Sequence, residues 1–171
     1  EEIREVCAER AAGVYFEAGQ RLWAEYDALE LRITGALTQA AVDRASRQKL
    51  QVRNRMLGQL QQAIETGHPL YLSAATYYAG LAQWEYGNFL RDVQLPASMP
   101  AEQQEAARQG AAQNAEQFYT EARNIWQTLL ERAQQENIQN EWVERARAAL
   151  RGDVQVPPAG GDDAGSTDGG E

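Results

Sequence analysis

Few residues in this chain are of types that could do chemistry. The one histidine, His68, stands in a turn between Gly67 and Pro69, and the one cysteine, Cys7, lies among apolar residues at helical spacing. A histidine that acts as a base or a metal ligand needs partners nearby in space, and the sequence brings none to His68. We therefore expect His68 to be a loop or cap residue and Cys7 to be a small buried thiol.

The known catalytic and metal-binding motifs are also missing from the sequence. It contains no His-Glu-x-x-His segment, no paired cysteines for zinc and no glycine-rich phosphate loop after a strand. The acids Asp162, Asp163 and Asp168 lack the spacing of a calcium-binding loop. We therefore expect a chain that is not an enzyme and that needs no cofactor and no metal.

A basic cluster is the one local feature that points to binding. Within twelve residues the chain carries Arg44, Arg47, Lys49, Arg53 and Arg55. At about 100° per residue, Arg44, Arg47 and Arg55 fall on the polar side of a helix, as a solvated face or as the site of an acidic partner. They are our candidate partner-binding residues.

The other two cations of the cluster, Lys49 and Arg53, fall in the apolar stripe of the same helix. An isolated buried charge is costly, so their heads must reach water or pair with acids, unless the helix outruns its partners there. We expect this part of the helix to project beyond the packed body.

The element that organises the rest of the chain is the segment 70–90. It has one charge, Glu85, among small residues and aromatic rings. A helix that is apolar on nearly every side must be wrapped by others, so we expect it to be the buried centre of an all-α antiparallel array. Its internal polar residues and the lack of a dense Leu/Ile/Val run argue against a transmembrane segment.

Apolar residues at steps of three and four predict the surrounding helices. Before the centre, the stripe over residues 3–41 includes Cys7, Ala11, Val14, Ala18, Leu22, Tyr26, Leu29 and Ile33. The apolar stripe resumes after residue 41 and continues to Ile64. The pattern fits either one continuous helix or two helices with a break near Gly35. After the centre, helices follow over 115–133 and from Trp142 to Leu150. We expect about five helices, several of them long, and no strand.

Composition divides the chain into two parts. Residues 152–171 are rich in Gly and Asp, with no aromatic and no basic residue. Such a segment cannot bury enough surface to offset its ordering entropy. We expect one helical domain over 1–151 and a disordered tail over 152–171. The net charge of −9 includes five tail acids, so the body is only mildly acidic and lacks the basic face that nucleic acid requires.

Several segments of the second half carry a family likeness. They are AATYYAGLAQWEYGNFL, the linker LPASMPAEQQEA, AEQFYTEARNIWQTLLERA and NEWVERARAAL. Over residues 48–151 the chain resembles the C-terminal units of large tetratricopeptide-repeat (TPR) proteins of gliding bacteria. The matching positions are Ala75, Gly80, Ala122, Trp126, Leu129 and Asn140 to Trp142. No second copy at the usual period of about 34 residues is visible, so the likeness is to a degenerate, capping portion.

The resemblance implies a scaffold in a bacterial cell-envelope complex and favours an envelope or periplasmic location. The residues alone leave compartment, partner identity and oligomeric state open. We expect a non-catalytic scaffold or adaptor whose partners are other proteins. The alternative is a helical carrier that binds an apolar or peptide ligand between helices 70–90 and 115–133.

Overall fold

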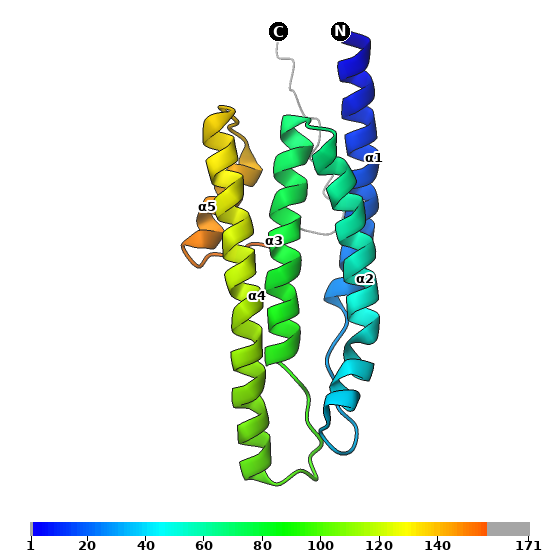
Figure 1. Ribbon diagram of the computed structural model, residues 1–171, viewed down its shortest axis with the longest axis vertical. Coiled ribbons are helices and arrows are strands. Elements are labelled where there is room, and N and C mark those ends of the chain that lie inside the picture. The colour runs from blue at the N-terminus through cyan, green and yellow to red at the C-terminus, as the bar shows by residue number, and fades with distance from the viewer. Residues whose placement is uncertain (1, 157–171) are drawn as a thin grey trace, which may run out of the picture.

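Five α-helices make up the chain in the computed structural model, which describes residues 2–156 (Figure 1). They are α1 (Glu2–Asp27), α2 (Gln39–Glu65), α3 (Pro69–Arg91), α4 (Ala101–Gln135) and α5 (Glu141–Leu150). Consecutive helices α1 to α4 run up and down side by side. Over the described residues there is no strand beyond one isolated bridge, so the predicted all-α antiparallel array is confirmed.

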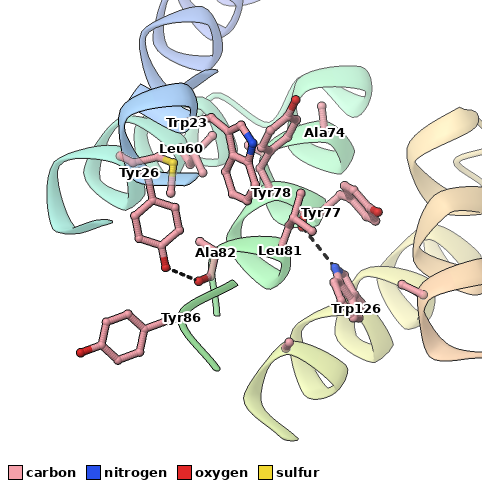
Figure 2. Packing of buried hydrophobic residues seen from close by; sticks show 14 of the residues in the cluster. Trp23, Tyr26, Leu60, Ala74, Tyr77, Tyr78, Leu81, Ala82, Tyr86 and Trp126 are labelled. Atoms are coloured by element: carbon pink, nitrogen blue, oxygen red, sulfur yellow. Dashed lines mark hydrogen bonds between the residues drawn. The ribbon is translucent and has the colours of Figure 1, made fainter. Parts of the chain in front are cut away.

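Helix α3 is the centre of this array, as the sequence predicts. It contacts each of the other four helices. Its small residues admit rings from α4: a Cβ added at Gly80 would collide with the Trp126 indole, and one at Gly87 would lie 2.6 Å from Tyr119. The Trp126 Nε1–H donates to the Tyr77 carbonyl at 3.1 Å (Figure 2). No helix in the described part of the chain is long and apolar enough to cross a membrane.

Local residues set where the central helix begins. Gly67 takes the left-handed conformation, φ +74°, that ends α2 and its turn, and Pro69 is the first residue of α3. The start of α5 is set by Asn140, whose Oδ1 accepts from the amides of Trp142 and Val143 at 3.1 Å.

Helix α1 ends earlier than the sequence pattern predicts, so the helical assignment of Leu29 and Ile33 is wrong. After Asp27 the chain is extended, and the Ile33 amide donates to the Gln94 carbonyl at 2.9 Å. The segment Leu29-Glu30-Leu31-Arg32-Ile33 alternates apolar and polar residues, a period of two that fits an extended strand as well as a helix. The break therefore precedes Gly35 by several residues.

The buried face of α1 agrees with the predicted stripe only in part: Tyr26 is buried and Leu22 is half-buried, but the rest of the stripe is displaced. The residues that face the core are Ala12, Phe16, Gly19, Trp23 and Tyr26. In contrast, Val14 is 65% exposed and Cys7 is exposed, so the expectation of a buried thiol is wrong. Both stripes have helical spacing and share Tyr26, but the observed stripe also buries Phe16 and Trp23, whose large side chains remove more apolar area from water.

The predicted tail begins inside the folded body. Val154 is half-buried against the core, and the Tyr77 hydroxyl donates to the Gln155 carbonyl at 2.6 Å. The folded unit thus extends past the predicted boundary at residue 151. The rest of the predicted disordered tail, residues 157–171, lies outside the described residues.

Candidate binding surfaces

Lys49 does not project from the body, and the prediction that it does so is wrong. Its side chain is fully buried, and its Nζ donates to Glu85 Oε1 at 3.1 Å and to the Leu29 carbonyl at 3.1 Å. The ammonium also lies 4.3 Å from the centre of the Tyr26 ring. Burial lowers the pKa of Lys49, and the Glu85 carboxylate opposes that shift. The one charge of the central helix is thus the partner of the buried cation.

This ion pair belongs to a polar network that joins three helices. Asn88 donates to Glu85 Oε2 at 3.3 Å, and the Tyr119 hydroxyl of α4 donates to Asn88 Oδ1 at 3.0 Å. Nearby, the Tyr26 hydroxyl donates to the Ala82 carbonyl at 2.6 Å (Figure 2). The bonds satisfy polar groups between packed helices, so the network serves structure rather than binding.

The three predicted partner-binding arginines are exposed but do not form one site. Arg44 lines a hollow of about 370 Å³ together with Arg32 and Thr34. Arg55 forms an ion pair with Glu25 of α1 at 3.4 Å. Arg44 and Arg55 are eleven residues apart, about 16 Å along a helix. Arg47 is exposed between them, so the three side chains define a strip of surface rather than a pocket.

Arg53 differs from buried Lys49 and from the three exposed arginines because it is half-buried and has no carboxylate partner among the described residues. Its guanidinium lies 4.6 Å from the Tyr86 ring centre and 6.0 Å from that of Phe118. Its described hydrogen bond is a long one of 3.4 Å to the neutral Gln83 side chain, and its buried Nε has no partner among the described residues. The cation is held by rings, and its charge is not balanced by an ion pair in the described part of the chain.

Two adjoining hollows lie at the end of the molecule where α2 and α4 begin, the lower end in Figure 1. Their volumes are about 590 Å³ and about 270 Å³, and Leu37 and Ala107 line both. We call them together the end groove. Its apolar lining includes Leu37, Val42, Leu90, Met99, Ala107 and Ala111.

The end groove exists because the first part of α4 extends beyond the region where the helix packs against α3. The buried positions of α4 begin at Ala115, so the first fourteen residues of the helix, 101–114, have no buried member. The linker from α3 contributes Val93 and Leu95 to the lining of the groove, and the small residues Ala107, Gly110 and Ala111 of α4 remain half-buried beside it. These small residues, and the late start of the aromatic stripe, are the sequence signals that would have located the groove.

Aromatic rings fill the contact between α3 and α4 where a carrier would hold its ligand. Trp84 and Tyr119 have ring centres 4.6 Å apart, and those of Tyr86 and Phe118 are 4.7 Å apart. Trp126 packs on Gly80. The end groove lies further toward the start of α4, next to residues 107–114.

The remaining chemical residues are not assembled into a site in the described part of the chain. His68 precedes α3 with its ring 5.4 Å from that of Tyr71, and its Nδ1 is buried without a hydrogen-bond partner. No group of three or more His, Cys, Asp or Glu among the described residues could hold a metal ion. Comparisons with protein-family models, with curated proteins and with solved structures give no match to this chain.

Proposed function

We propose that this chain is a non-catalytic protein–protein interaction module, a scaffold or adaptor that holds an apolar segment of a partner protein in the end groove. The observation that carries the proposal is an apolar groove left open on an otherwise closely packed array. Leu37 is 40% exposed there. Covering such surface stabilises a complex by about 25 cal/mol per Å² of apolar area, before the costs of association.

The chemistry of the end groove favours binding over catalysis. None of the residues that line its two hollows is ionisable. The groove therefore offers no acid or base for proton transfer and no charged ligand for a metal. It does offer a concave apolar surface with a few polar side chains, which is the usual composition of a recognition site.

We further propose that the module is TPR-like and closes a larger bacterial cell-envelope assembly. The support is the segment likeness over residues 48–151 and the succession of antiparallel helix pairs, α1 with α2 and α3 with α4. Helix pairs of this kind bury their faces by stacking against neighbouring pairs. An envelope location rests on the likeness alone.

Site-specific photocrosslinking in the source cells tests the interaction proposal. A photoreactive residue at Ala111 lies in the end groove, and one at Gln127, exposed elsewhere on the same helix, is the control. We expect a polypeptide crosslinked at Ala111 but not at Gln127, through an apolar stretch. A lipid or small apolar ligand at Ala111 would favour the carrier alternative.

A matched pair of substitutions then links binding to the groove. Leu37→Asp should weaken binding of the crosslinked polypeptide about tenfold or more, because it places a charge on the apolar lining. Leu70→Asp is the control, since Leu70 is similarly exposed, 36%, at the start of α3. Equal binding by both variants would contradict the proposal.

A further inference from the structure

One face of α3 stays half-open between α2 and α4. Ala79, Gln83 and Leu90 lie on this face, at positions that a helix places on one side, and each is half-buried, while Tyr86 between Gln83 and Leu90 is buried. Although α2 and α4 both pack on α3, their backbones do not approach each other along the described residues. We call this face the open strip. It leads into the end groove, because Leu90 also lines the groove.

Arg53 sits over this strip. Its guanidinium reaches Gln83 on α3, and it lies over the Tyr86 ring next in line on the same face. The Phe118 ring, which α4 contributes on the other side of the strip, lies 6.0 Å from the guanidinium. The Arg53 side chain therefore extends from α2 across the open strip and lies over the rings of Tyr86 and Phe118.

Within the part of the chain that the structure describes, Arg53 lacks the acidic partner that Lys49 has. One helical turn earlier, Lys49 has a carboxylate and a carbonyl as partners. Arg53 has two rings and one long bond to a neutral amide. A guanidinium has five N–H donors in a rigid fork, and its preferred partner is a carboxylate bound through two of them. Rings that fix its plane reduce the ordering cost of such a contact.

We infer that the partner segment is an amphipathic helix that runs from the end groove along the open strip and sets an aspartate or glutamate against Arg53. This inference rests on the proposed function and specifies the partner's chemistry. Leu90 and Gln83 are seven residues apart on α3, about 10 Å along its axis. A helix lying along the strip therefore carries its acidic residue about seven positions, two turns, from the apolar residue in the groove.

Selection from a displayed library of helical peptides tests this even while the natural partner is unidentified. The probes are eighteen-residue amphipathic helices with random residues on one face, about 27 Å long. On the native protein we expect enriched peptides with an apolar residue and an Asp or Glu seven positions away. Their binding should fall about tenfold in Leu37→Asp, and about tenfold again when the peptide acid is replaced by its amide.

Substitution of Arg53 decides the charge assignment. Selection on Arg53→Glu should replace the acidic preference by Lys or Arg at the same spacing, and Arg53→Gln should abolish the preference without reversing it. Arg55→Glu, on the exposed side of the same helix, is the control and should keep the acidic preference. Circular dichroism melting checks that each variant is folded. If Arg53→Glu does not fold, the loss of the acidic preference in Arg53→Gln is the test.

The two possible failures are distinct. Peptides that depend on Leu37 but show no acidic preference, or keep it in Arg53→Glu and Arg53→Gln, would overturn the role of Arg53 and leave the proposed function standing. Failure to select any peptide that depends on Leu37 would overturn both.

Discussion

At the scale of single residues, two cations of the same helix have different surroundings. Lys49 and Arg53 both fall in the apolar stripe of α2, one turn apart. Lys49 forms a buried ion pair with Glu85. Removing either side chain would leave the other charge buried without its partner. Arg53 lies against two aromatic rings at the edge of the core, where we propose that a carboxylate of the partner meets it. Both residues lie in the same stripe of α2, so only their surroundings distinguish the structural role of Lys49 from the binding role that we propose for Arg53.

Lys49→Met should destabilise the protein by about 2–4 kcal/mol, because the mostly buried Glu85 carboxylate is left unpaired. The double variant Lys49→Met with Glu85→Gln should recover most of that loss, since neither charge then remains in the core. Urea unfolding monitored by circular dichroism measures both. Arg55→Met, which breaks the exposed pair with Glu25, is the control and should cost about 0.5 kcal/mol or less. A Lys49→Met variant as stable as the parent would contradict this account of Glu85.

At the scale of the helices, small residues determine how closely neighbours approach α3. Gly80 and Gly87 each receive an aromatic side chain of α4 in the space that a Cβ would fill. Gly58 of α2 does not make such a close contact, because a Cβ added there would have no neighbouring atom of the described residues within 4 Å. The packing of α3 against α4 is therefore specified by a few positions, and the open strip lies beside this contact.

Gly80→Ala should destabilise the protein by about 1–3 kcal/mol, because Trp126 must move and loses its bond to the Tyr77 carbonyl. Gly80→Leu should cost more. Gly58→Ala is the matched control and should stabilise by about 0.5–1 kcal/mol, since alanine is the better helix former at an open position. Thermal melting compares the three variants. A Gly80→Ala protein that melts with the parent would show that α4 does not need this close approach.

The outward face of α2 offers a further test of partner charge. Changing Arg44, Arg47 and Arg55 together to Glu should change stability little, since all three are exposed. If this face also meets an acidic partner, the variant should bind the crosslinked partner more weakly, most visibly at low salt, where exposed charges are least screened. Binding measured across a salt series separates this outcome from a contact made by the end groove alone, for which the triple variant would bind like the parent.

At the scale of the whole molecule, a contact between residues distant in sequence holds the segment after α5 against the core. Tyr77, in the middle of the central helix, donates to the carbonyl of Gln155, 78 residues away. Burial raises the pKa of Tyr77 to about 12, and burial also raises the pKa of Tyr26, Tyr78 and Tyr86. In the unfolded chain tyrosine ionises near pH 10. The folded state therefore holds these protons more tightly than the unfolded state does.

Stability should accordingly be constant with respect to these tyrosines below about pH 10 and fall as the pH rises from about 10 to 12. For Tyr77 alone the loss is on the order of 2–3 kcal/mol over that window. Tyr77→Phe should be about 1 kcal/mol less stable near neutral pH, from the lost hydrogen bond, and should show a shallower decline above pH 10. Urea midpoints across the pH series, with tyrosinate absorbance, measure both effects. An unchanged slope in Tyr77→Phe would contradict the role given to this hydroxyl.

Three features could be predicted from the sequence alone: the helical class, the central place of residues 70–90 and the turn at Gly67 and Pro69. These follow from local causes, namely periodicity, composition and the backbone preferences of glycine and proline. Tertiary structure alone decided which face of α1 is buried, that Lys49 meets Glu85 across 36 residues, and that Arg32 lies beside Gln94 across 62. Two apolar stripes of equal spacing, or two cations on one stripe, differ only in what packs against them. That partner is brought by distant parts of the chain, so no local pattern could distinguish the alternatives.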